Sequence, residues 1–183
     1  MADKIISEEL DFDDVSIRPN RSSLNSRSEV DLYRDIKWTS PSGKQHVLRC
    51  KTLCAANMGT VGTLSMAKEL STRGYLCALE KHYSAEDICK LFEELEERAL
   101  NELYVKDKND YTDRVAISIG IKEPLDTIIE VSKNYKVNIV NIDVPNGYCP
   151  KLLERVQEVR KLLHECFIIA GSVVTGDIVT DLI

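Results

Sequence analysis

The chain has 183 residues, 43% of them hydrophobic and 30% charged, and this balance excludes a wholly disordered protein. A formal net charge of −6 argues against nucleic acid as a partner. The opening residues are acidic, and no apolar stretch is long enough for a bilayer, so we expect a cytoplasmic protein without membrane partners.

Residues 1–50 are polar, rich in Ser and Arg and only weakly periodic, so we interpret them as an amino-terminal extension that wraps a sheet. From residue 51 to 183, short apolar runs alternate with helix-period segments, which indicates βα units around a parallel sheet. The five runs are expected to be strands at 52–57, 75–79, 115–119, 137–142 and 166–171.

Capping residues, prolines and a glycine between these runs predict where the helices begin and end. Ser84 followed by Asp87 resembles a capping box, and Thr175 suits the N-cap of a last helix. Pro124 and Pro150 suit first-turn positions, whereas Gly74 suits the position just after a helix.

Parallel βα alternation permits either an open doubly wound sheet or a closed barrel. No GxGxxG follows the first strand, which weakens the dinucleotide-binding open sheet. A complete barrel needs about 250 residues. The pattern therefore favours a closed barrel and leaves an open parallel sheet as the alternative, and five βα units are too few to close a barrel.

The cysteines indicate neither disulfides nor a metal centre. They contain no CxxC pair, and no second ligand cluster accompanies the CxxxC, so we expect reduced thiols and no metal site. The six residues are Cys50, Cys54, Cys77, Cys89, Cys149 and Cys166.

Candidate functional residues follow the predicted strands, because ligands of parallel α/β proteins bind at the carboxyl ends of the strands. Lys81 could hold an anion and His82 could carry a proton, although spacing alone favours a surface lysine and a structural histidine. Asp143 could accept hydrogen bonds from a ribose, or belong to an ordinary turn. Asn57, Gly120 and Gly171 follow or end the other strands.

One further candidate lies in the extension. Ser26 and Arg27 offer a hydroxyl and a guanidinium suited to phosphate, and a solvated basic loop is the alternative.

Read as strings, several segments resemble GMP reductase of the animal and enterobacterial type, in the order in which that family has them. The match favours GMP reductase over its relative IMP dehydrogenase, whose opening segment differs. The segments are DFDDVSIRPNRSSLNSRSEVDL (11–32), AANMGTVGT (55–63), KHYS (81–84), DVPNGY (143–148) and AGSVVTGD (170–177).

This resemblance implies an α/β fold of the parallel (βα)8 TIM-barrel type, of which only about five βα units are present in this chain. It also implies a homotetrameric oxidoreductase that converts GMP to IMP and ammonia with NADPH in purine nucleotide salvage. It implies a catalytic and cofactor-contacting role for Lys81. The other cofactor-binding residues that it implies are Ser26, Arg27, Asp143, Val144 and Pro145.

The chain also departs from the family pattern. Gly59 replaces an aspartate and Ser172 an asparagine, so we expect lost polar contacts near the cofactor. In the family, the nucleophilic cysteine and the potassium-binding backbone belong to a loop after the sixth strand of the barrel. This chain ends at Ile183, after the fifth predicted strand, so we expect that loop to lie beyond it. The isolated chain is therefore expected to be inactive. The alternatives are a truncated homologue that associates with and modulates full-length subunits, and an IMP dehydrogenase relative.

Overall fold

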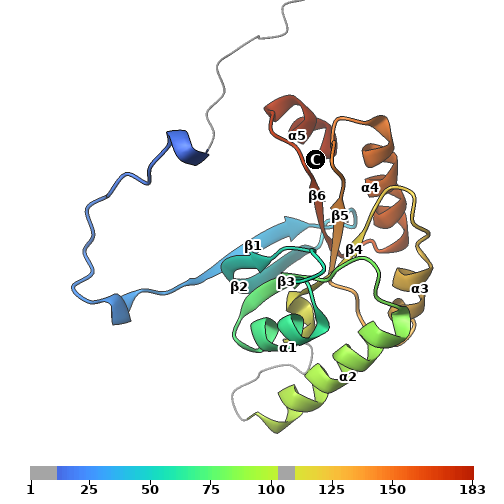
Figure 1. Ribbon diagram of the computed structural model, residues 1–183, viewed down its shortest axis with the longest axis horizontal. Helices are drawn as coiled ribbons and strands as arrows, with labels where there is room; N and C mark the ends of the chain where they lie inside the picture. The colour runs from blue at the N-terminus through green and yellow to red at the C-terminus, as the bar shows by residue number, and fades with distance from the viewer. Residues whose placement is uncertain (1–11, 103–109) are drawn as a thin grey trace, which may run out of the picture. The chain divides into compact units, whose positions relative to one another are not determined.

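The computed structural model describes residues 12–102 and 110–183, and the chain divides into two units, Met1–Asp31 and Leu32–Ile183 (Figure 1). The described part of the first unit holds two short 3-10 helices, Phe12–Asp14 and Arg27–Glu29. All regular strands and α-helices of the described residues belong to the second unit.

The second unit is built on one sheet whose strands follow the chain order β1-β2-β3-β4-β5-β6. β1 is antiparallel to β2, and β2 to β6 are parallel. All five predicted strands are present, but the first begins at Gln45 and ends at Ala55, earlier than the predicted 52–57. The six strands of the described residues are β1 Tyr33–Thr39, β2 Gln45–Ala55, β3 Tyr75–Ala78, β4 Val115–Ile119, β5 Ile139–Asp143 and β6 Phe167–Gly171.

Each parallel strand is followed by one α-helix, so the chain forms five βα units. The predicted capping box is confirmed, since Ser84 and Asp87 bond each other's backbone at the start of α2. Gly74, with φ of 86°, follows the C-cap of α1 as predicted. The helices are α1 Leu64–Thr72, α2 Ala85–Asn101, α3 Asp126–Ser132, α4 Pro150–Leu162 and α5 Gly176–Leu182.

The two prolines behave differently. Pro150 is the first residue of α4, as expected. The expected N-cap Thr175 is also observed, at the start of α5. The expectation for Pro124 is wrong, because α3 begins only at Asp126. The buried Arg155 binds backbone carbonyls of the preceding loop and holds it in a non-helical path.

The two faces of the sheet pack differently, and this distinguishes the barrel type from the open sheet. One face packs with the helices in a large core that contains Leu79, Ile117 and Ile142. The other carries a smaller cluster drawn from strands alone: Leu48, Cys50, Leu76, Ala78, Ala116 and Ile139. A doubly wound sheet reverses its strand order and has helices on both faces. Sequential strands with helices on one face confirm the α/β, barrel-type prediction, with five of its units present.

A β-hairpin in the extension was not predicted. β1 and β2 pair from Tyr33 and Lys51 to a turn at Gly43, whose φ is 82°. Trp38 stacks on His46, packs near Phe167 of β6 and donates a 3.0 Å hydrogen bond to the Glu165 carbonyl. The hairpin therefore reaches the amino end of β6, away from the edge where ligands of parallel sheets bind.

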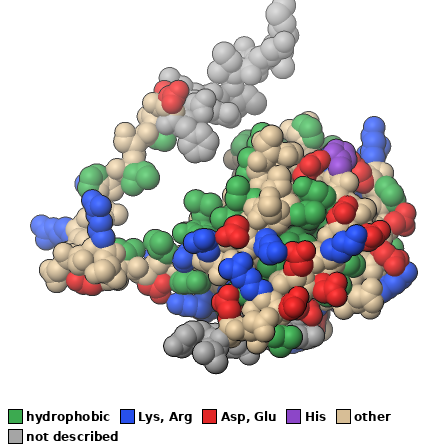
Figure 2. All heavy atoms as spheres, turned by 60° about the horizontal axis from the view of Figure 1, so that its bottom comes forward, with side chains coloured by type: hydrophobic (Ala, Val, Ile, Leu, Met, Phe, Trp, Pro, Cys, Tyr) green, Lys and Arg blue, Asp and Glu red, His purple; other side chains and the backbone are tan. Residues whose placement is uncertain are grey.

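None of the helices formed by residues 12–102 and 110–183 has the length and hydrophobicity needed to cross a bilayer. Figure 2 shows Lys and Arg side chains interspersed with Asp and Glu on the face that it presents. Among the described residues, that face lacks the continuous basic surface that binds a phosphate backbone.

Candidate functional site

The loops that follow the parallel strands gather at one edge of the sheet. Parallel strands present their carboxyl ends on the same side, and β2 to β6 are paired in parallel. The structure thereby brings to this edge five predicted positions, which are Asn57, Lys81, Gly120, Asp143 and Gly171. We call this edge the mouth.

A side-chain hydrogen bond crosses the mouth. Asn57 Nδ2, after β2, donates to Asp143 Oδ2, at the end of β5, over 3.0 Å. β3 and β4 lie between these strands in the sheet. Three strand spacings in a flat sheet amount to roughly 14 Å, beyond the reach of two short side chains. Because Asn57 lies beyond the end of β2, the loop after β2 reaches across the mouth to the end of β5.

The turn after β5 is joined to the turn after β6 by backbone hydrogen bonds. Val144 N donates to Gly171 O at 2.8 Å, and Ser172 N donates to Val144 O at 3.0 Å. Gly147 N donates to Ser172 O, and a Cβ on Gly147 would lie 2.4 Å from that oxygen, so the close approach requires glycine. Val144 has its side chain buried, whereas Pro145 is exposed.

Lys81 forms an ion pair with a residue that the sequence analysis did not single out. Lys81 Nζ lies 3.0 Å from Glu123 Oε1, and both side chains are somewhat more than one-third exposed. This hydrogen bond from Lys81 is the main cause that lowers the pKa of Glu123. Nothing in the sequence marks Glu123, because its partner lies 42 positions away. The pair links the loops after β3 and β4.

Arg155 of α4 holds the loop that carries Glu123. Its buried guanidinium donates to the carbonyls of Gly120 at 3.1 Å, Ile121 at 2.9 Å and Glu123. These charge-assisted bonds satisfy carbonyls that no strand or helix uses. The carboxylate that faces Lys81 is thus anchored through its backbone.

A cleft of about 340 Å³ opens between the loops after β3 and β4. This volume is within the range of small-ligand sites. At its floor Ser118 is buried, and its hydroxyl accepts a 3.0 Å hydrogen bond from Asn141. Polar lining residues of the cleft include Glu80, Lys81, His82, Tyr83, Ser84 and Glu123.

Ser26 and Arg27 lie in the first unit. Ser26 is the N-cap of the 3-10 helix Arg27–Glu29, and its hydroxyl accepts a 3.3 Å hydrogen bond from Ser28 N. Both residues are exposed. Their predicted contact with a cofactor stays a prediction.

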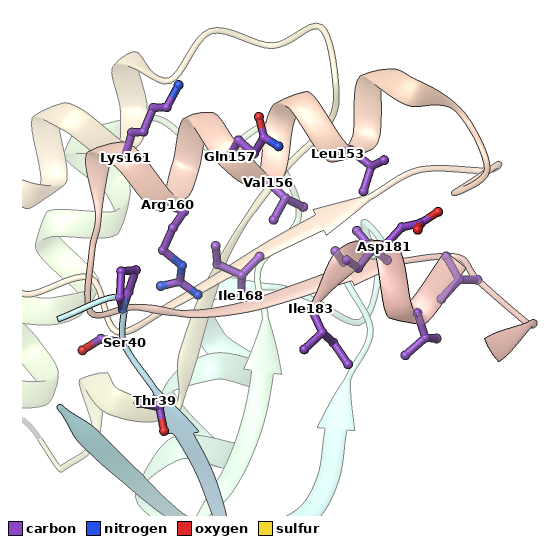
Figure 3. Close-up of a pocket in the computed structure, with 15 residues that line it drawn as sticks. Thr39, Ser40, Leu153, Val156, Gln157, Arg160, Lys161, Ile168, Asp181 and Ile183 are labelled. Carbon is purple, nitrogen blue, oxygen red and sulfur yellow. The ribbon is translucent and has the colours of Figure 1, made fainter. Parts of the chain in front are cut away.

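A larger hollow of about 730 Å³ lies between α4, β6 and α5 (Figure 3), and Lys81 is not among the residues that line it. Leu153 and Val156 of α4, Ile168 of β6 and Ile183 give it apolar walls, and Arg160 points into it. It has no cluster of catalytic groups, so chemistry favours the smaller cleft as the candidate site. Within residues 12–102 and 110–183, no group of three His, Cys, Asp or Glu is placed to hold a metal ion.

The model of the IMP dehydrogenase / GMP reductase domain matches residues 9–183. The chain belongs to this family. The resemblance read from the sequence motifs is thereby confirmed.

Named relatives of this family member include GMP reductase of Vibrio vulnificus (strain YJ016), 36% identical over 176 residues. GMP reductase 2 of Bos taurus is 38% identical over 178 residues, and GMP reductase 1 of Mus musculus is 39% identical over 174. Each alignment covers 95% of this chain but 46% of the relative, so the chain spans about half the length of these relatives.

Proposed function

We propose that the chain is a GMP-reductase-like oxidoreductase whose mouth binds NADPH beside a purine nucleotide, GMP being the substrate. The observation that carries this proposal is the gathering of Lys81 and Asp143 at the carboxyl edge of parallel strands, next to a cleft of about 340 Å³. The relatives' names support the substrate class. A cytoplasmic homotetramer, as the resemblance implies, is part of the same proposal.

The proposed role of each site residue follows from the chemistry of its side chain. NADPH, when bound, supplies a hydride. Lys81 offers a mobile cation that can leave Glu123 and approach an anionic group or the reacting atoms. Asp143 and Pro145 are exposed and are proposed to contact the cofactor, whereas buried Val144 holds the turn through its backbone. Ser26 and Arg27 are proposed to bind phosphate or ribose.

The nucleophile is proposed to come from outside these 183 residues, together with any potassium site. Burial raises the pKa of Cys77 to about 12 and that of Cys166 to about 11. Burial also raises the pKa of Cys50, Cys54 and Cys89. In these five of the six cysteines, the raised pKa disfavours the thiolate that attacks a purine. The isolated chain should accordingly bind nucleotide without turning it over.

Calorimetric titration of NADPH into the chain tests this proposal. Lys81→Ala should weaken binding about tenfold, which corresponds to about 1.4 kcal/mol. The melting temperature should hardly change, because exposed ion pairs contribute little stability. Lys133→Ala removes a more exposed ion pair, with Glu130, and serves as the control. Equal affinity of both variants would remove Lys81 from the site, and tighter binding of NAD than of NADPH would favour the IMP dehydrogenase alternative.

A second candidate function is association with full-length reductase subunits that the chain modulates. The observation that favours it is β6, which is the outer strand of the sheet in the described residues and lies beside the hollow of Figure 3. Open strand edges readily pair with other chains. Light scattering of the chain mixed with a full-length GMP reductase tests it, and the absence of a mixed species together with an unchanged reductase rate would exclude it.

A further inference from the structure

Gly59 leaves a space in the mouth that faces a carboxylate from another strand. A Cβ built on Gly59 would lie 3.7 Å from Glu80 Oε2 and 3.9 Å from Glu80 Cδ, an ordinary van der Waals contact. Among the described residues outside the chain neighbours of Gly59, only Glu80 comes within 4 Å of that point. The end of β3 therefore presents its carboxylate to the loop after β2.

The backbone around Glu80 is fixed by close packing. Glu80 N donates a 2.8 Å hydrogen bond to Gly62 O. A Cβ on Gly62 would lie 2.4 Å from Ala78 O and 2.8 Å from Ala56 O, so the loop lies directly on the end of β3. Such contacts leave the backbone little freedom, and Glu80 keeps its place without help from a ligand.

The side chain of Glu80 has acceptor capacity that the protein does not use. It is 25% exposed, and His82 Nε2 lies 4.0 Å from Oε1, too far for a hydrogen bond. No donor among the described residues is hydrogen-bonded to either carboxylate oxygen. A carboxylate can accept about four hydrogen bonds, and one that is largely buried gains from each of them. Glu80 also lines the 340 Å³ cleft together with Lys81.

We propose that Glu80 is a ligand-contacting, specificity-determining residue of the mouth, whose carboxylate accepts a hydrogen bond from a neutral donor of the bound nucleotide, a ribose hydroxyl or a carboxamide N–H. This inference rests on the proposed nucleotide site. It also revises the expectation that Gly59 deprives the mouth of a carboxylate, because Glu80 places one beside the same position from the next strand.

A carboxylate swap between the two positions tests the proposal. Glu80→Ala should weaken the binding of NADPH at least tenfold in calorimetry. Gly59→Asp added to Glu80→Ala returns a carboxylate to the same space from the other loop and should recover affinity to within about threefold of the unsubstituted chain. Gly59 has no positive φ, so aspartate fits its backbone. Glu97→Gln, at an exposed position of α2, is the control and should bind NADPH normally.

The outcomes separate the two proposals. If Glu80→Ala binds NADPH as tightly as the unsubstituted chain does, Glu80 makes no ligand contact and the nucleotide site still stands. If Glu80→Ala loses affinity but Gly59→Asp recovers none of it, a carboxylate in that space is not what the ligand needs, and the proposal is overturned. If the unsubstituted chain binds neither NADPH nor GMP, the proposed function fails and takes this inference with it.

Discussion

Asn57 Nδ2 donates to Asp143 Oδ2 over 3.0 Å and so joins the loop after β2 to the end of β5, across two intervening strands. The strands themselves would be roughly 14 Å apart in a flat sheet, so the loop after β2 must extend over the ends of the intervening strands to make this contact. The two residues thus bring together loops of strands that are not neighbours, as a shared mouth requires.

Removing this contact should cost little stability but loosen the mouth. Asn57→Ala deletes a hydrogen bond to a charged acceptor at a half-buried position, so the free energy of unfolding should fall by about 1 kcal/mol. Urea denaturation measures the change. Asn134→Ala, at an exposed position just after α3, is the control and should lie within about 0.5 kcal/mol of the unsubstituted chain. Equal stability of the two variants would show that the Asn57–Asp143 bond is not formed in solution.

Arg155 should matter far more for stability than an exposed arginine. Arg155→Met leaves the carbonyls of Gly120, Ile121 and Glu123 without their donor, so we expect a loss of about 3 kcal/mol in the free energy of unfolding. Arg73→Met removes only an exposed pair with Glu69 and should cost less than about 0.5 kcal/mol. Similar denaturation midpoints for both variants would contradict this assignment.

The features predicted well from sequence are those that local chemistry determines. The apolar run at 115–119 is the strand Val115–Ile119, because a strand covered on both faces needs apolar residues throughout. Ser84 and Asp87 form the predicted capping box because both partners lie within one helical turn.

The features missed depend on partners distant in sequence. Burial alternates along β2 on either side of Val47, which is the period-2 pattern of a strand. This alternation arises from the pairing of β2 with β1 and the packing of the sheet, so the residues of β2 by themselves did not predict it. Lys81 meets Glu123, and Glu80 lies beside Gly59, only because loops that follow neighbouring strands pack together. No local signal in the sequence predicts either contact.

Gly62 should be irreplaceable even by alanine. Its φ is not positive, so the limit is space: an added Cβ would lie 2.4 Å from a backbone oxygen that cannot move without disturbing β3. We expect Gly62→Ala to lower the free energy of unfolding by about 3 kcal/mol. Gly176→Ala, which has open space at the start of α5, should be neutral or slightly stabilising. Thermal melting compares the two, and an unaffected Gly62→Ala would mean that the loop after β2 lies farther from β3.

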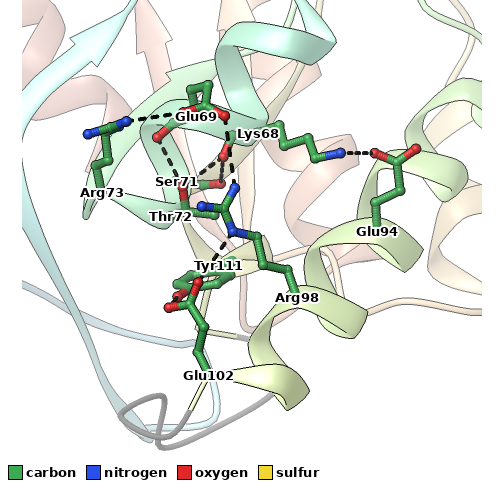
Figure 4. A network of polar contacts seen from close by, with 9 residues as sticks. All are labelled: Lys68, Glu69, Ser71, Thr72, Arg73, Glu94, Arg98, Glu102 and Tyr111. Atoms are coloured by element: carbon green, nitrogen blue, oxygen red, sulfur yellow. Dashed lines mark hydrogen bonds and ion pairs between the residues drawn. The ribbon is translucent and has the colours of Figure 1, made fainter.

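Tyr111 takes part in a polar network between α1, α2 and the segment before β4 (Figure 4). Its hydroxyl donates to Glu102, which also accepts from Arg98 Nε at 3.3 Å, and Arg98 lies 3.9 Å from Glu69 of α1. Burial, and then the hydrogen bond to Glu102, raise the pKa of Tyr111 from 10.0 to about 12. The same hydrogen bond lowers the pKa of Glu102.

This raised pKa predicts a loss of stability at alkaline pH. Between about pH 10 and about pH 12 the unfolded chain releases the Tyr111 proton while the folded chain keeps it, so the stability that Tyr111 contributes is complete below pH 10 and falls as the pH rises through its folded pKa. Urea unfolding across this range should show a steeper decline for the unsubstituted chain than for Tyr111→Phe, which has no proton to release. Glu102→Gln should shift the phenolate absorbance change of Tyr111 to lower pH. Parallel declines for the unsubstituted chain and Tyr111→Phe would show that the Tyr111 hydroxyl titrates as it does in water.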